Sequence, residues 1–303
     1  MNAIETTQLS KRFPGGHGVH ELDLAVPAGA IYGFLGPNGA GKTTTIRLLL
    51  SLLRPDGGTV RIFGEPLAMH RRGALADVGA LVESPSLYSH LTGRENLEVT
   101  RRLTGAAERR VDDVLRIVEL LDDADRLVRT YSLGMRQRLA LGLALLGEPR
   151  LLILDEPSNG LDPAGILELR SLLRRLVAEQ GITVFISSHL LAEVEQIATH
   201  LGVIDHGRLL FEGTVEQLRR RAPARLVIDC DDVAGAVEVL RAAGERATAD
   251  GNGTVVVALA ERSGAEINRM LVERGIGIGR LVPEEASLES LFLTLTRGEA
   301  SAA

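Results

Sequence analysis

The segment that most constrains this chain is Gly36-Pro37-Asn38-Gly39-Ala40-Gly41-Lys42-Thr43. It matches G-x-x-x-x-G-K-[ST], the pattern of the phosphate-binding P-loop. The apolar run before it, residues 30–35, predicts a buried strand, and the leucine spacing across residues 44–53 predicts a helix. Strand, glycine loop and helix in this order are the context that the motif requires, so the sequence predicts a nucleotide-phosphate site.

The chemistry of this loop follows from its composition. Glycines allow backbone angles that side chains forbid, so successive N–H groups can point inward as an anion nest. The N-terminus of the following helix adds its own N–H groups. Lys42 is one of only two lysines in the chain, whereas arginine is abundant, and its compact charge suits the terminal phosphates. We expect residues 36–44 to bind the phosphates, with the Thr43 hydroxyl reaching Mg²⁺ and Thr44 a phosphate.

Composition limits the remaining classes. A chain of 303 residues has room for two domains, and its net charge of −6 argues against nucleic acid as the main partner. The single cysteine, Cys230, permits no internal disulfide, which suits a reducing compartment. The sequence has neither a signal segment nor an apolar run of membrane-spanning length. We therefore expect a cytoplasmic protein whose role at a membrane, if any, passes through a partner.

A second group of residues completes a nucleotide-hydrolysing site. Four apolar residues, 151–154, precede Asp155 and Glu156, which is typical of a buried parallel strand that ends at a ligand site. Asp155 is placed to hold Mg²⁺, through water, and Glu156 to act as the general base for the attacking water. A second strand, residues 183–188, leads to His189, which can donate a hydrogen bond to the γ-phosphate.

Between these motifs stands Tyr131-Ser132-Leu133-Gly134-Met135-Arg136-Gln137-Arg138. It resembles the signature of ABC-transporter ATPases, whose consensus is L-S-G-G-Q followed by [RK]-Q-R, and the order of all the motifs across about residues 2–220 is similar to that family. The resemblance implies a head-to-tail dimer in which each ATP lies between the P-loop of one subunit and Ser132 to Gly134 of the other. It also places Phe13 where the family stacks an aromatic ring on adenine.

The chain departs from the family pattern at three positions. Leu133 and Met135 replace a glycine and the glutamine of the signature. Glu83 stands where the family has a glutamine that touches Mg²⁺, and a carboxylate there is expected to contribute to nucleotide and metal binding and to alter metal affinity or coupling. With residues 91–97, these features resemble the ATPases of bacitracin- and lantibiotic-type exporters, which pair with ABC-2 permeases.

Two domains are expected. Residues 1–221 form an α/β P-loop NTPase domain of the ABC ATPase type, with a helical lobe across residues 84–147. Residues 222–303 alternate as strand, helix, strand, strand, helix, strand, with a hairpin signal at residues 250–253, which predicts a small α+β domain of ferredoxin-like order. A final helix is expected from Ser287, and no catalytic constellation occurs in this domain.

The sequence as a whole predicts an ATP-hydrolysing subunit that powers export through a separate membrane permease, bound to the inner face of the cell membrane through that permease. Two alternatives stay open: a soluble ABC ATPase that acts on a ribosome or another macromolecule, and a nucleotide-gated regulator with little turnover. A single P-loop and an intact Glu156 and His189 favour the exporter subunit. The transported substrate, the choice between homodimer and heterodimer, and the role of the C-terminal domain are not determined by the sequence.

Overall fold

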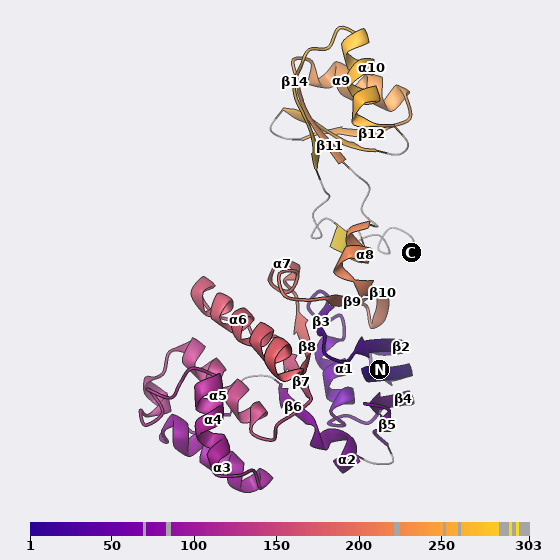
Figure 1. Cartoon of the computed structure of the whole chain (residues 1–303). Coiled ribbons are helices and arrows are strands. Elements are labelled where there is room, and N and C mark those ends of the chain that lie inside the picture. Colours follow the sequence, from indigo (N-terminus) through magenta and orange to yellow (C-terminus); the bar gives the residue numbers. More distant parts are fainter. Residues whose placement is uncertain are drawn as a thin grey trace. The chain divides into compact units, whose positions relative to one another are not determined.

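The computed structural model describes residues 1–68, 71–82, 86–220, 225–250, 253–259, 262–284, 291–292 and 295–296. The chain forms two compact units, Met1–Val215 and Glu216–Ala303 (Figure 1). The sequence places the domain boundary after residue 221, within the first residues of the second unit. Each unit has its own core and is described by itself.

A six-stranded sheet is the centre of the first unit, with the strand order β10-β9-β3-β8-β7-β6. Every neighbouring pair is parallel except β9 and β10. The three strands β3, β7 and β8 are buried along their whole length because they are apolar on both faces. The strands are β3 (Ile31–Leu35), β6 (Val78–Leu81), β7 (Leu151–Asp155), β8 (Thr183–Ser188), β9 (His200–Asp205) and β10 (Arg208–Thr214).

A second, antiparallel sheet with the order β2-β1-β4-β5 was not expected from the sequence. Its side chains join those of β3 and α1 in one hydrophobic core, which includes Leu22, Val26 and Phe34. The alternation of buried and exposed residues along the second half of β2 is the signal that identifies a half-buried strand. The strands are β1 (Asn2–Arg12), β2 (Gly18–Pro27), β4 (Gly57–Ile62) and β5 (Glu65–Pro66).

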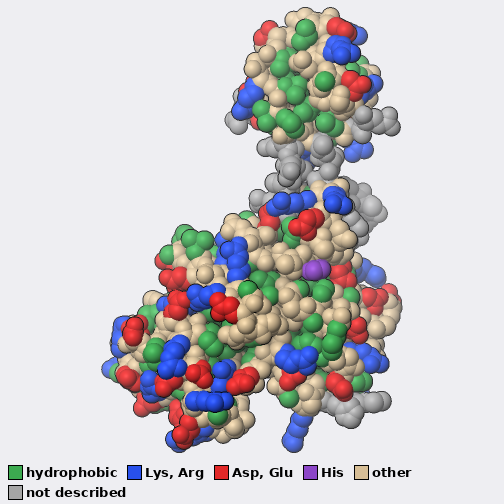
Figure 2. Space-filling view, in the orientation of Figure 1, with side chains coloured by type: hydrophobic (Ala, Val, Ile, Leu, Met, Phe, Trp, Pro, Cys, Tyr) green, Lys and Arg blue, Asp and Glu red, His purple; other side chains and the backbone are tan. Residues whose placement is uncertain are grey.

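Helices cover the sheets and form a lobe of their own. In the lobe, α3, α4 and α5 contact one another, and α3 begins with a capping box between Thr92 and Glu95 (Figure 1). Charged side chains of both signs are interspersed over its surface (Figure 2). The helices of the first unit are α1 (Lys42–Leu49), α2 (Arg71–Ala76), α3 (Gly93–Thr104), α4 (Arg109–Ile117), α5 (Leu133–Leu145), α6 (Pro163–Gln180) and α7 (Leu191–Val194).

Two helices end earlier than the leucine spacing predicts. The helix expected to run to residue 53 ends at Leu49, and Ser51 has a φ of 53°. Apolar residues continue at helical spacing across residues 111–121, but α4 ends at Ile117, and Glu119 has a φ of 55°. Both residues lie in the left-handed region, which interrupts helical hydrogen bonding although the apolar periodicity continues beyond it.

The second unit has one antiparallel sheet with the order β12-β13-β11-β14. Its elements follow one another as strand, helix, strand, strand, helix, strand, in the order expected from the sequence. Inward-facing residues of the sheet, such as Ile228 and Val257, share a core with Leu240 and Leu271 of the two helices. The elements are β11 (Arg225–Cys230), α9 (Val233–Ala242), β12 (Arg246–Ala249), β13 (Thr254–Ala258), α10 (Gly264–Glu273) and β14 (Ile278–Glu284).

Three further points concern the chain ends and the connection between the units. Helix α8 (Val215–Arg220) begins at the last residue of the first unit. The expected start of the final helix, Ser287, lies outside the described residues. Among the residues that the structure describes, no helix combines the length and the hydrophobicity needed to cross a bilayer.

Candidate functional site

The P-loop connects the end of β3 to the start of α1 and needs its glycines for two reasons. A Cβ atom on Gly36 would lie 2.3 Å from the carbonyl oxygen of Ile204, so no side chain fits there. Gly39 and Gly41 have φ values of 83° and 109°, in the region that favours glycine. Gly41 is also the N-cap residue of α1, so the loop delivers its N–H groups to a helix N-terminus.

Two neighbouring turns support the loop. The N–H of Gly207 donates to the carbonyl of Ala40 at 2.9 Å, and a Cβ on Gly41 would lie 3.1 Å from the carbonyl oxygen of Gly18. The β1–β2 hairpin therefore lies against the P-loop. Phe13 occupies the turn of this hairpin and is 39% exposed. The Phe13 ring is therefore accessible, although it does not line the cavity described next.

A cavity of about 320 Å³ unites three segments that are distant in sequence. It lies at the carboxyl ends of β3, β7 and β8, the edge where parallel sheets hold their ligands. Asn159 belongs to its wall and was not predicted. The lining residues are Asn38, Gly39, Gly41, Lys42, Thr43, Thr44, Glu156, Asn159 and His189.

The charged groups of this cavity converge on Glu156. Lys42 Nζ lies 3.2 Å from Glu156 Oε1, and it also donates to the carbonyls of Gly36, at 2.7 Å, and Pro37, at 3.2 Å. His189 Nδ1 lies 2.7 Å from Glu156 Oε2. Glu156 therefore presents its carboxylate to the cavity, and the contacts with Lys42 and His189 hold that carboxylate in place.

Ser187 is a site residue that sequence reasoning missed. It is fully buried and lies opposite Asp155 in the β7–β8 register. Its hydroxyl donates to Asp155 Oδ1 at 2.6 Å and accepts from the N–H of Glu156 at 2.9 Å. Glu156 has a φ of 48°, an uncommon angle for a residue with a side chain, and the bond from Ser187 supports this conformation.

The predicted signature residues lie at the start of α5. Ser132 is the N-cap, and its hydroxyl oxygen accepts from the N–H of Met135 at 3.2 Å. The preceding Tyr131 is buried and donates from its hydroxyl to the carbonyl of Asp123 at 2.6 Å. Burial raises the pKa of the Tyr131 phenol, and the charge of Asp123 adds to that effect. Tyr131 therefore holds the turn in place while Ser132 stays exposed.

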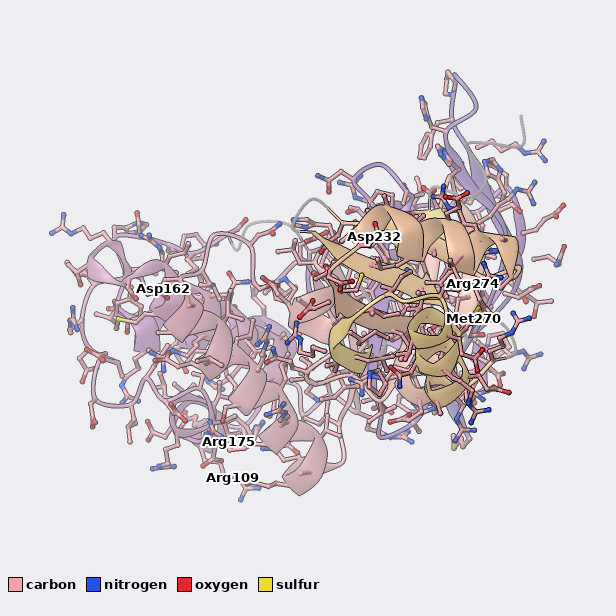
Figure 3. All side chains as sticks on the ribbon, turned by 90° about the horizontal axis from the view of Figure 1, so that it is seen from above. Arg109, Asp162, Arg175, Asp232, Met270 and Arg274 are labelled. Carbon is pink, nitrogen blue, oxygen red and sulfur yellow. The ribbon has the colours of Figure 1, made fainter. Side chains whose placement is uncertain are left out.

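The structure does not bring Ser132 and Gly134 to the cavity of their own chain, because neither lines it. Instead, the signature turn packs on the turn after Glu156, where a Cβ on Gly160 would lie 3.2 Å from Leu133 Cδ2. That turn ends at Asp162, which caps α6 by accepting from the N–H of Gly165 (Figure 3). Glu83, the remaining predicted ligand, lies outside the described residues.

Comparison with known proteins identifies the family. The sequence profile described as ABC transporter matches residues 19–159. The bacitracin transport ATP-binding protein of Bacillus licheniformis is 41% identical over 298 residues, which are 97% of each chain. This chain belongs to the ABC transporter ATP-binding proteins. As a member of that family it is an ATP-binding and ATP-hydrolysing transporter subunit, as the sequence predicts.

Two further comparisons support the assignment of this ABC ATPase. The daunorubicin/doxorubicin resistance ATP-binding protein of Streptomyces peucetius is 39% identical over 97% of this chain and 92% of its own length. A solved structure of the ATP-binding subunit of an ABC transporter is 30% identical, with a TM-score of 0.64, and covers 72% of this chain and 92% of its own. The predicted ABC ATPase fold and the resemblance to bacitracin-type transport ATPases are thereby confirmed, while the ferredoxin-like assignment of the C-terminal domain stays a prediction.

Proposed function

We propose that this ABC ATPase hydrolyses ATP to power the export of a peptide antibiotic, a drug or a similar compound through a separate ABC-2-type permease. The observation that carries the proposal is the convergence of Lys42, Glu156 and His189 on one cavity at the P-loop. A regulator that only binds nucleotide has no need of a positioned base. The arrangement therefore favours turnover over the regulatory alternative.

The residues of the cavity divide into binding and catalytic roles. The N–H groups of residues 36–44 and Lys42 would bind the phosphates, and Phe13 would stack on the base. Glu156 would take the proton of the attacking water, and His189 would hold the γ-phosphate. Lys42 contacts Glu156 in the structure, so entry of the phosphates would draw Lys42 away from that carboxylate and free it for its role as base.

The residues at the metal position fit Mg²⁺. Thr43 offers a hydroxyl at the cavity wall, and Asp155 offers a buried carboxylate. Among the described residues no group of three His, Cys, Asp or Glu side chains is arranged to hold a metal ion. A site with so few protein ligands suits Mg²⁺, which keeps its waters and phosphate oxygens. Glu83 would add a third ligand or tune coupling to the permease.

We further propose that two copies assemble head to tail. Ser132 and Gly134 stand at an exposed helix N-terminus, which favours an anion, yet they do not line the cavity of their own chain. A second subunit can bring this N-terminus to the γ-phosphate. Loss of that phosphate on hydrolysis would then weaken the contact between the subunits, which links nucleotide state to closure.

The partner that handles the cargo would be a multi-span permease in the cell membrane, with the ABC ATPase bound at its inner face. The two named relatives act in the transport of bacitracin and in resistance to daunorubicin and doxorubicin, which are chemically unlike compounds. Selection of the cargo therefore belongs with the permease rather than with the ATP site. In this proposal residues 1–221 supply the ATPase and residues 222–303 an accessory domain of ferredoxin-like order.

The test is affinity capture of the tagged full chain from detergent-solubilised native membranes, followed by mass spectrometry and a phosphate-release assay. We expect a stoichiometric multi-span protein, with ATPase activity that a matched Lys42→Ala preparation lacks. Recovery only with ribosomal or other cytoplasmic proteins would instead support the soluble alternative. Recovery of the permease without phosphate release would support the regulatory one.

A further inference from the structure

Among the described residues of the second unit, helices α9 and α10 cover one face of the sheet and leave the other face open. Alternate residues of the strands, among them Leu226, Ile228, Val255 and Val257, are buried against α9 and α10. The residues between them point to the opposite face, where Val227 and Val256 are half-buried and Val282 is 40% exposed. Figure 3 labels Met270 on α10 and Arg274 at the C-cap of that helix, which packs on the covered face.

The cross-strand register arranges this open face in three rows. The central row reads Thr248, Val256, Val227 and Val282 across β12, β13, β11 and β14. A first row on one side of it contains Arg246, Ala258 and Arg225, ending at position 284. A third row on the other side contains Thr254, Asp229 and Arg280. Asp250 lies beside Thr254 in this row, and its Oδ1 accepts a hydrogen bond from the N–H of Thr254 at 3.0 Å.

At two matching positions the outer rows carry opposite charges, Arg225 and Arg246 in the first row against Asp229 and Asp250 in the third. Asp229 is also paired with Arg280 of its own chain, at 2.9 Å. A two-fold axis along the central row would place the first row of one copy over the third row of another. Arg225 would then face Asp229 of the second copy, and Arg246 would face its Asp250. Ala258 would face Thr254, and neither residue is charged. The valines would meet their own counterparts.

From this pattern we propose that the open sheet face, defined by these three rows, binds the same face of a second copy of this chain. Valine rows supply apolar contact at the spacing of about 10 Å that stacked sheets adopt. The outer rows supply charge complementarity, which sets the orientation and disfavours other partners. The contact requires no nucleotide, and it does not rest on the ATP-dependent pairing proposed above.

The size of the face sets the expected strength. Four strands about 4.8 Å apart and about five residues long, at about 3.4 Å each, give about 300 Å² per copy. A standard stable interface buries about 800 Å² per partner, so this contact is expected to be weak. Two chains held on one permease would be at high effective concentration, where such an affinity is sufficient.

The first experiment is sedimentation velocity of the full chain without nucleotide, from about 1 to 300 μM. We expect a reversible monomer–dimer equilibrium that Val227→Asp weakens at least 10-fold, because it places two carboxylates against each other at the axis. The matched control is Val272→Asp, at a 56% exposed valine of α10 in the same unit, which should leave the equilibrium unchanged. A wild-type chain that stays monomeric, or equal effects of the two variants, would overturn the proposal.

A charge exchange tests the orientation. Arg225→Asp and Asp229→Arg should each weaken self-association, since the altered side chains meet like charges in both halves of a symmetric dimer. A mixture of the two variants, carrying different fluorophores, should restore association as a heterodimer, because both contacts between positions 225 and 229 then join opposite charges. Circular dichroism melts confirm that each variant is folded. Failure of the mixture to associate more tightly than either variant alone would refute the two-fold arrangement.

Discussion

Replacing Ser187 by alanine tests whether one buried hydroxyl positions both acidic residues of the ATP site. The hydroxyl donates to Asp155 and accepts from the N–H of Glu156, at 2.6 and 2.9 Å. The substitution removes both bonds without touching the cavity wall, since Ser187 does not line it. Ser187 is thus a positioning residue in our interpretation, and its loss should change catalysis more than nucleotide binding.

The expected magnitude follows from the two bonds. A hydrogen bond to a charged group contributes about 1.5–3 kcal/mol, and a buried N–H left without a partner costs about 1–3 kcal/mol. Because the neighbouring groups relax, we expect the free energy of unfolding to fall by about 2–4 kcal/mol. Freed from the bond at its N–H, Glu156 can leave its left-handed conformation, and we expect kcat to fall about 10- to 100-fold, equivalent to about 1.4–2.7 kcal/mol.

The assay is steady-state phosphate release with varied ATP and varied Mg²⁺, together with urea unfolding. KM for ATP should stay within about 3-fold of the wild type while the Mg²⁺ concentration for half-activation rises, because Asp155 loses its orienting donor. Ser188→Ala is the matched control, because that hydroxyl is as well buried but bonds only to Leu190. Ser187→Thr keeps the hydroxyl and should recover part of the loss.

Two outcomes would refute this reasoning. The first is a Ser187→Ala enzyme with wild-type kcat and wild-type Mg²⁺ dependence. The second is an equal loss of activity in Ser187→Ala and Ser188→Ala, which would show that general destabilisation of β8 rather than positioning of Asp155 and Glu156 causes the defect.

Three further predictions use other parts of the chain. Lys42→Ala should weaken ATP binding at least 100-fold, about 2.7 kcal/mol, as measured by isothermal titration calorimetry; tight binding would refute the P-loop assignment. Glu156→Gln should bind ATP but lose at least about 100-fold in turnover, and gel filtration should show an ATP-dependent dimer; normal hydrolysis would exclude Glu156 as the base. Burial raises the pKa of the Cys230 thiol above its usual 9.0, and the charge of Asp231 adds to this. Since the thiolate is the reactive form, alkylation of this single cysteine should accelerate only above pH 9 in the native protein and at lower pH in urea; identical profiles would contradict the packing of β11.

The P-loop residues were predictable because they form one contiguous sequence motif. The three-glycine spacing, the lysine and the following helix are local, and so are the acidic pair at the end of β7 and the histidine after β8. Pattern reasoning therefore identified Lys42, Glu156 and His189, which the structure brings to one cavity. This inference did not require knowledge of which strands pair in the sheet.

Ser187 was not identified from the sequence because its role depends on the pairing of two strands that are distant in sequence. Ser187 reaches Asp155 only through the register of two parallel strands joined by a long helix, and no local pattern encodes that register. The ends of the helices were also not predictable from the spacing of apolar residues. Ser51 and Glu119 adopt left-handed angles where the leucine periodicity still continues, so the spacing alone predicts helices that are too long.

Ser132 has two separate hydrogen-bonding capacities, one for capping α5 and one for a group of the neighbouring subunit. Its oxygen lone pair accepts from Met135, which leaves the hydroxyl hydrogen available for an external acceptor. Aspartate caps a helix about as well as serine, so the stability of α5 does not discriminate between the two residues. An aspartate, however, offers no hydrogen and repels phosphate. Selection for serine at this position would therefore come from outside the monomer, and Ser132→Asp would give a chain that folds normally yet cannot serve its neighbour.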